Sequence, residues 1–178
     1  MIIRATAKLL KIARVSPVKN ESSISGALPG EWYASLLNTG RNGVYAIHFL
    51  HNPTMISIIV LNKSLTRALE VLPARVSAYL IRNGFSELVP GFGLDSQHKI
   101  YTTNSRNILA NMTQMKFDIE YNLAISEVLD STDIDRIEDL YLRYILGGKI
   151  ANGDYIMPVN QLFELIEAFQ PNAFMAIH

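Results

Sequence analysis

The chain has 178 residues, of which 49% are hydrophobic and 18% are charged, and its 16 basic and 16 acidic residues cancel. A chain of this length is expected to form a single domain over residues 1–178, with a core that needs no covalent cross-links. The neutral balance argues against a general nucleic-acid-binding protein, because contact with a phosphate backbone needs a basic surface. The charged fraction is below the roughly 25% of typical domains, which favours a homodimer.

Cysteine is absent, which excludes disulfides, thiolate catalysis and Cys-ligated zinc. The opening residues, Met-Ile-Ile-Arg-Ala-Thr-Ala-Lys, lack the long apolar run of a signal peptide. No stretch approaches the roughly 18 apolar residues that a membrane-spanning helix needs. We therefore expect a cytoplasmic protein that makes no membrane contact.

The first third, residues 1–61, is predicted to be β-rich, with a short strand over 1–6 and a short helix over 7–13. A loop over 16–30 follows, because it contains prolines, glycines and serines. Three runs rich in β-branched and aromatic residues come next, at 32–39, 44–50 and 55–61. The first two flank Asn42-Gly43, the dipeptide best suited to a two-residue type I′ turn. These runs predict an antiparallel three-stranded meander.

Two-residue turns at 42–43 and 52–53 would divide the meander into two faces, because successive side chains point to opposite sides of a strand. One face is apolar and is expected to belong to the core: Trp32, Leu36, Tyr45, Ile47, Phe49, Ile56, Ile58 and Val60. The other face is mixed: Tyr33, Leu37, Ala46, His48, Leu50, Met55, Ser57 and Ile59. We expect the mixed face to be half-covered or to meet a partner.

Residues 62–178 are predicted to be mostly helical, which gives an α+β fold with the meander packed against several helices. The expected elements are helices over 63–71, 73–84, 103–129, 131–146 and 158–168, and a short strand over 100–102. Asn62, and Ser131 or Thr132, are the expected N-caps. In the long helix, one stripe is apolar: Ile108, Met112, Met115, Ile119 and Leu123. The opposite side is apolar too, with Phe117, Tyr121, Ala124 and Val128, which indicates a central helix or a subunit contact.

No cofactor or metal is expected. His48 and His51 form an H-x-x-H pattern, but residues three apart on a strand point to opposite faces, so one ion cannot easily take both. The glycines at 90–93 and 147–149 match neither nucleotide-binding motif. Four acidic residues at the start of a helix are interpreted as a solvated face that complements the helix dipole: Asp133, Asp135, Glu138 and Asp139.

The most informative polar run is Thr103, Asn104, Ser105, Arg106 and Asn107. It combines hydroxyl and amide side chains, an arginine and the free backbone N–H groups of a helix start. Such a combination is suited to binding a phosphate or a carboxylate. The alternative is ordinary helix capping, with Arg106 paired to a nearby acid.

Three functional hypotheses follow. The first is a non-enzymatic binding module that engages a protein or a small anion near residues 103–107. The second is a small enzyme acting on a phosphorylated or nucleic-acid substrate, with Arg106 as electrostatic stabiliser and His48 or His98 as general acid or base. In that case Trp32, His48 and His98 would be cleft residues, although Trp32 is better interpreted as an anchor of the sheet. The third is an adaptor whose mixed sheet face docks a partner through Tyr33, Leu37 and Leu50.

Three blocks of the sequence resemble a bacterial domain family of unknown function. The blocks are residues 2–10 (Ile-Ile-Arg-Ala-Thr-Ala-Lys-Leu-Leu), 30–37 (Gly-Glu-Trp-Tyr-Ala-Ser-Leu-Leu) and 103–112 (Thr-Asn-Ser-Arg-Asn-Ile-Leu-Ala-Asn-Met). Members of that family often have Gly-Ser-Met-Asn where this chain has Ala110-Asn111-Met112-Thr113. The resemblance covers most of residues 1–125 and implies no activity.

Overall fold

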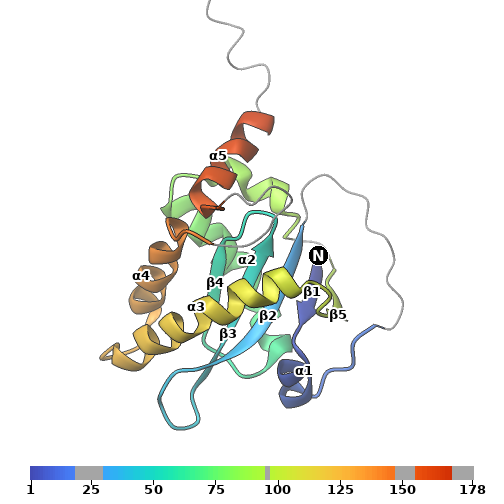
Figure 1. Cartoon of the computed structure of the whole chain (residues 1–178), viewed down its shortest axis with the longest axis vertical. Coiled ribbons are helices and arrows are strands. Elements are labelled where there is room, and N and C mark those ends of the chain that lie inside the picture. Colours follow the sequence, from blue (N-terminus) through green and yellow to red (C-terminus); the bar gives the residue numbers. More distant parts are fainter. Residues whose placement is uncertain (19–29, 95–96, 147–154, 170–178) are drawn as a thin grey trace, which may run out of the picture.

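The computed structural model describes residues 1–18, 30–94, 97–146 and 155–169. Its elements are β1 (Ile2–Ala5), α1 (Ala7–Ala13), β2 (Glu31–Asn38), β3 (Tyr45–Asn52), β4 (Ser57–Val60), α2 (Leu65–Arg82), the 3-10 helix η1 (Ser86–Phe92), β5 (Lys99–Thr102), α3 (Arg106–Ile125), α4 (Ser131–Leu142) and α5 (Pro158–Phe169). Figure 1 shows the sheet between layers of helices. The predicted α+β class is confirmed.

The sheet has the strand order β4-β3-β2-β1-β5. Strands β2, β3 and β4 form the predicted antiparallel meander. Strand β1 is parallel to both of its neighbours, β2 and β5, so the sheet is mixed rather than purely antiparallel. Both faces of β1 are covered, and its four residues are all buried. This burial is typical of strands with parallel neighbours on both sides.

The predicted two-residue turn at Asn42-Gly43 is wrong. The last pair of the hairpin is Asn38 with Tyr45, which leaves six residues in the loop. Thr39 Oγ1 donates a hydrogen bond to the carbonyl of Val44 at 2.8 Å inside this loop. The Arg41 side chain extends to the backbone carbonyls that follow α3, those of residues 126–128. The longer loop therefore lets an arginine satisfy carbonyl groups at the end of a helix.

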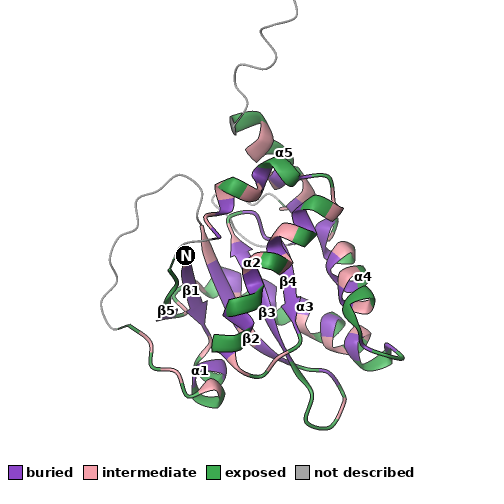
Figure 2. Cartoon of the chain, turned by 180° about the vertical axis from the view of Figure 1, so that it is seen from behind, coloured by how far each residue is buried: buried purple, intermediate pink, exposed green. Residues whose placement is uncertain are grey.

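The predicted division of the meander into two faces nevertheless holds, because the register is displaced by an even number of residues. The first face packs with α1, α2 and η1, except for Tyr45, which was expected in the core but is 39% exposed at the start of β3. The second packs under α3 and α4, and buried residues dominate the sheet in Figure 2. Tyr33, Leu37 and Leu50 are at most 1% exposed. The adaptor hypothesis is contradicted, since the chain's own helices cover the face that it required.

The two helices predicted around Pro73 are one continuous helix, α2, with Pro73 inside it. Its N-cap is Ser64, whose Oγ accepts from Arg67 N, whereas Asn62, two residues earlier, accepts from Ser64 N through its Oδ1 and does not cap the helix. Buried residues continue across the proline along one side of α2: Leu65, Ala68, Leu69, Leu72, Val76, Tyr79 and Leu80. Burying this side against the sheet outweighs the proline's cost, about 3 kcal/mol in a helix interior.

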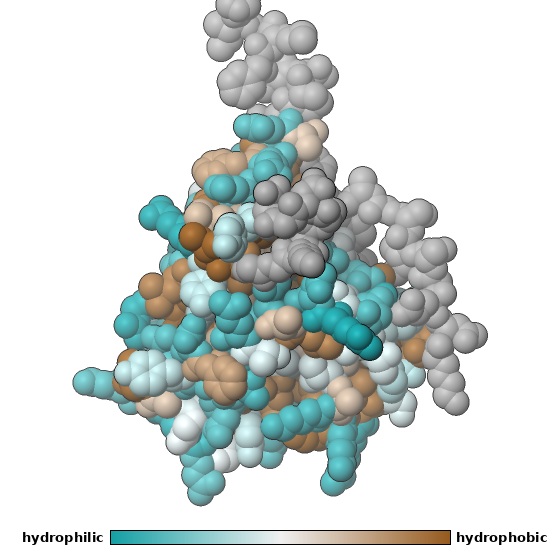
Figure 3. Space-filling view, viewed as in Figure 1, coloured by the Kyte–Doolittle hydropathy of each residue, from teal (hydrophilic) through white to brown (hydrophobic). Residues whose placement is uncertain are grey.

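Helix α3 begins at Arg106, after the N-cap Ser105, and ends at Ile125, so it is shorter at both ends than the predicted 103–129, while its predicted apolar stripe is buried. The opposite side is exposed: Phe117 by 69%, Tyr121 by 65%, and Val128 just beyond the helix by 70%. In Figure 3, apolar side chains lie among polar ones on the face that α3 crosses. Helix α4 is capped by Asp130, not by Ser131 or Thr132. Among the residues that the structure describes, no helix is long and apolar enough to cross a membrane.

Candidate functional site

The candidate segment lies where the connections after two neighbouring parallel strands diverge. The chain leaves β1 into α1, which packs on the face with α2. It leaves β5 through residues 103–105 into α3, which packs on the opposite face. In open sheets with parallel strands, ligands bind in the crevice formed at such a divergence, outside the carboxyl ends of the strands. The topology therefore places residues 103–107 at a favourable position for binding.

The local geometry at the start of α3 combines capping with an available cation. Ser105 Oγ accepts from Ile108 N at 3.4 Å and so caps the helix. Arg106 is exposed, and no ion pair joins it to another residue in the described part of the chain. The paired Arg106 required by the capping alternative is thus not observed.

A polar cluster lies beside this helix start and connects three strands to it. Arg4 is 5% exposed and donates from Nε and Nη2 to the two carboxylate oxygens of Glu31, both at 2.7 Å. Its Nη1 donates to the Thr102 carbonyl at 3.3 Å. The hydroxyl of Tyr33 donates to Asn104 Oδ1 at 2.6 Å. The cluster fixes the backbone that enters α3, because bidentate arginine–carboxylate pairs are geometrically specific.

Residues from all three sequence blocks meet in this cluster. Arg4 comes from the first block, Glu31 and Tyr33 from the second, and Asn104 from the third. The blocks are separated by 27 and 71 residues along the chain at these contacts. Pairing of β1 with both β2 and β5 brings them together. Sequence reasoning identified the blocks but did not predict that they converge.

The expected cleft residues Trp32, His48 and His98 are not brought together. Trp32 is fully buried on the α2 side, with its ring 4.7 Å from that of His51. His48 is fully buried on the α3 side, where its Nε2 lies 2.5 Å from Ser57 Oγ. His48 and His51 thus point to opposite faces of the sheet, as the alternation of side chains along the strand predicted. The expected cleft is wrong because Trp32 and His48 lie on different sides of the sheet.

Neither His48 nor His98 is placed to act as a general acid or base beside Arg106. Burial lowers the pKa of His48 to about 3, so the ring is neutral near neutral pH. His98 precedes β5, whereas Arg106 follows its carboxyl end. Five residues of extended chain separate His98 from Thr103 by about 16 Å. Among the described residues, no cluster of three or more His, Asp or Glu side chains could bind a metal ion.

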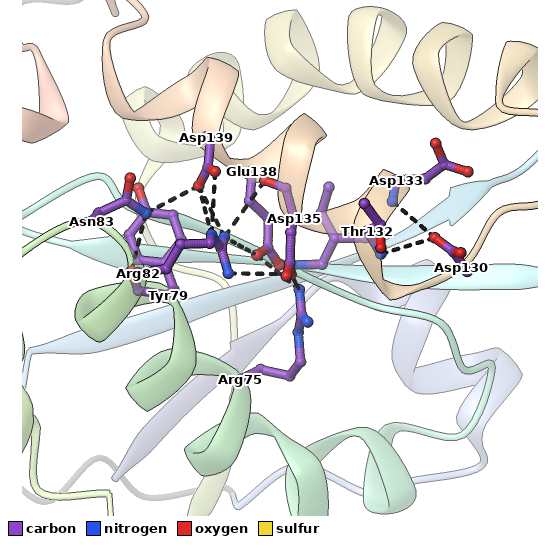
Figure 4. A network of polar contacts seen from close by, with 11 residues as sticks. Arg75, Tyr79, Arg82, Asn83, Asp130, Thr132, Asp133, Asp135, Glu138 and Asp139 are labelled. Atoms are coloured by element: carbon purple, nitrogen blue, oxygen red, sulfur yellow. Dashed lines mark hydrogen bonds and ion pairs between the residues drawn. The ribbon is translucent and has the colours of Figure 1, made fainter.

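The acidic residues of α4 are not a solvated face, which corrects the sequence interpretation. Glu138 is fully buried and lies 2.8 Å from Arg75 Nη2 and 3.2 Å from Arg82 Nη2. Its other oxygen accepts from Ile59 N at 2.8 Å. Asp135 pairs with Arg75 and Asp139 with Arg82 (Figure 4). Only Asp133 contacts the helix start, where it accepts from Leu129 N.

This network joins α2, α4 and β4, and ion pairs link its two arginines to its three acidic residues. Burial raises the pKa of Glu138, while the charge of Arg75 and the hydrogen bond from Ile59 oppose that change. A signal for the network existed in the sequence. Arg75 and Arg82 are seven residues apart on one helix, and the acids at 135, 138 and 139 have the spacing of one helical side. The ion pairs tie α2 to α4 and so contribute to stability, although Arg75 Nε and the Tyr79 hydroxyl in the same network are buried without a hydrogen-bond partner among the described residues.

Comparisons with known proteins identify the family. Residues 2–161 match the family described as Domain of unknown function (DUF6933), and the chain belongs to it. The resemblance to a domain family of unknown function is confirmed by this match. Comparisons with curated proteins and with solved structures gave no match.

Proposed function

We propose that this member of the DUF6933 family is a non-enzymatic binding module that takes a small anion at the start of α3. The observation that carries the proposal is Arg106, which is exposed at the first position of a 20-residue helix and has no ion pair among the described residues. The first N–H groups of a helix lack intrahelical partners, and the helix dipole favours negative charge there. A guanidinium adds a planar pair of donors that matches a carboxylate or a phosphate.

The polar cluster supports the proposal by making the site rigid. Tyr33 holds Asn104, and the Arg4–Glu31 pair holds the end of β5 through Thr102. Residues 103–105 are therefore anchored before a ligand binds. Anchoring reduces the ordering cost of binding, which otherwise lowers affinity. The enzymatic alternative lacks comparable support, since neither His48 nor His98 lies beside Arg106.

Calorimetric titration with inorganic phosphate tests the binding function. Arg106→Ala is expected to weaken phosphate binding about tenfold to a hundredfold, the effect of losing a charge-assisted hydrogen bond of 1.5–3 kcal/mol. Arg136→Ala is the matched control, because Arg136 is an exposed arginine on α4. Equal phosphate affinity in wild type and Arg106→Ala would overturn the proposal, as would the absence of phosphate binding.

We also propose that the protein is a cytoplasmic homodimer whose subunits meet through Phe117 and Tyr121 on the exposed side of α3 and Val128 just after the helix. The small charged fraction and this apolar helix side support the dimer. Light scattering is expected to give twice the mass of the chain, and Tyr121→Lys to give a single chain mass. Ile81→Lys is the control, because Ile81 is equally exposed but lies on α2. A monomeric wild type would contradict the dimer.

A further inference from the structure

The basic and acidic residues of this neutral chain lie in different parts of the fold. Two segments, 1–18 and 97–117, contain basic side chains and no acidic ones: Arg4, Lys8, Lys11, Arg14, Lys99, Arg106 and Lys116. Residues 118–139 contain Arg136 as their one base, against a series of acids: Asp118, Glu120, Glu127, Asp130, Asp133, Asp135, Glu138 and Asp139. The neutral total therefore conceals a separation of the two signs of charge.

The fold brings the two basic segments together. Strand β5 pairs with β1, and α1 and α3 begin beyond the carboxyl ends of these neighbouring strands. Lys8 of α1 and Lys116 of α3 line the same groove. Figure 1 shows α1 and the start of α3 on the side of the sheet where β1 and β5 lie, away from α4. The segments thus form one basic surface, which consists of Lys8, Lys11, Arg14, Arg106 and Lys116.

The charges of the basic surface are exposed and are not cancelled locally. Its members are exposed except for Lys116, which is partly exposed. Lys116 makes a long contact with Glu120, at 3.6 Å, and the other four have no ion pair among the described residues. Glu31 on the nearby strand β2 is already paired with Arg4. The surface therefore presents a positive potential to an incoming molecule.

The cations of α1 form a regular row. Lys8, Lys11 and Arg14 recur at every third residue, and side chains three apart on a helix lie about 5–6 Å from each other on one side. Such a row suits a repeated array of negative charges. A membrane surface fits less well, because a helix that lies in lipid must bury an apolar side there. Leu9 and Leu10, on the apolar side of α1, are buried in the protein's own core.

Linear charge density favours a nucleic acid over an acidic protein segment. Double-stranded DNA carries one negative charge per about 1.7 Å of its axis. An extended peptide carries at most one side-chain charge per about 3.3–3.6 Å. The denser polyanion holds more condensed counterions, and their release provides most of the affinity of cationic surfaces. Helix starts such as that at Arg106 are also common contacts of backbone phosphates.

We propose that the basic surface binds double-stranded nucleic acid through its phosphate backbone, without reading the bases. Lys8, Lys11 and Arg14 contact successive phosphates, and Arg106 contacts another beside the first N–H groups of α3. This inference goes beyond the anion site of the preceding section, because the row on α1 contacts phosphates whether or not Arg106 binds a free phosphate ion.

Fluorescence anisotropy of a labelled DNA duplex of about 20 base pairs, titrated with the full chain, tests the proposal. Wild type is expected to bind with a Kd of about 1–100 µM near physiological salt, the range of non-specific DNA binding. Lys8→Gln/Lys11→Gln/Arg14→Gln is expected to weaken binding at least about tenfold. The slope of log Kd against log salt concentration is expected to fall by about 2–3, because roughly three phosphate contacts are lost.

The matched control is Lys63→Gln/Arg67→Gln/Arg143→Gln. It removes the same amount of charge from exposed cations at the start of α2 and the end of α4. The control is expected to keep the wild-type salt slope and to bind the duplex within about threefold of wild type. Both variants change exposed side chains alone, so both are expected to unfold at the wild-type temperature.

Three results would overturn this inference. One is the absence of duplex binding, and another is an equal loss of affinity in the two triple variants, which would make net charge the cause. The third is binding of poly-glutamate as tightly as the duplex, which would make an acidic protein the partner. If phosphate titration fails while duplex binding still requires the row on α1, only the small-anion function is lost, so the two proposals are tested separately.

Discussion

The two polar regions of this protein differ in how their charges are compensated. At the β4 edge, two arginines of α2 meet three acids of α4, and the buried Glu138 is held from three directions. At the carboxyl ends of β1 and β5, by contrast, Arg106 and Lys8 have no ion pair among the described residues. Ion pairs between helices stabilise the fold, whereas unpaired cations suit an anionic ligand that the protein does not supply itself.

The Arg4–Glu31 pair lies between these extremes and shows why the contrast is informative. Its hydrogen bonds are as short as those of the β4-edge network, yet it contacts Thr102, four residues before Arg106. We infer that it serves as a rigid support for residues 103–105. Ion pairs thus stabilise the packing of α2 and α4 at the β4 edge, and the Arg4–Glu31 ion pair supports the segment that enters α3. The second role is inferred from the unpaired cation at the start of α3.

The largest expected effect comes from opening the closed network. Glu138→Ala is expected to lower the free energy of unfolding by about 3 kcal/mol, because it leaves the buried Ile59 N–H without its acceptor and removes one of the acidic partners of Arg75 and of Arg82. Urea denaturation measures the change. Arg136→Ala removes an exposed ion pair on the same helix and is expected to cost less than about 1 kcal/mol. A similarly small loss in Glu138→Ala would remove the contrast between the two regions.

A smaller effect is expected from His48, which is buried but has no charged partner. Its pKa falls from 6.5 to about 3 on burial, so the unfolded chain binds the proton more tightly than the folded chain. The stability due to neutral His48 is complete above pH 6.5 and is lost as the pH falls toward 3, at up to about 1.4 kcal/mol per pH unit.

Urea denaturation at pH 7, 6 and 5 measures this dependence on pH. His48→Gln keeps a polar group near Ser57 but cannot titrate, so its stability is expected to fall less steeply with decreasing pH than that of wild type. The comparison of slopes removes the contributions of the other titrating groups. Parallel slopes in the two proteins would show that burial of His48 does not perturb its proton equilibrium.

The fold was predictable where the spacing of apolar residues along one strand or helix determined which side is buried. Alternation divided the meander correctly, and the spacing from Ile108 to Leu123 gave the buried side of α3. Prediction failed where tertiary contacts outweighed a local signal. Asn42-Gly43 did not form a two-residue turn because Arg41 extends to the end of α3. Pro73 did not end α2 because the buried side continues past it.

The sequence predicted the segment 103–107 of the candidate site, but not the distant residues that lie beside it. Ser105 and Arg106 are recognisable from their order at a helix start, which is a local property. Convergence of Arg4 with Tyr33 and Asn104 depends on β1 pairing in parallel with two distant strands, and no local pattern encodes that pairing. Glu138 was misjudged for the same reason, since the arginines that bury it belong to another helix.

The carboxylate of Glu138 has one more consequence, for how this sheet can associate with other chains. It occupies the outward-facing N–H of Ile59 on the edge strand β4. At the opposite edge, the N–H of Val18 donates to the carbonyl of Ile100 on β5 at 2.8 Å. An incoming strand would have to displace a contact at either edge before it could extend the sheet, which protects against edge-to-edge aggregation. Any stable association between copies is therefore expected to use helix surfaces.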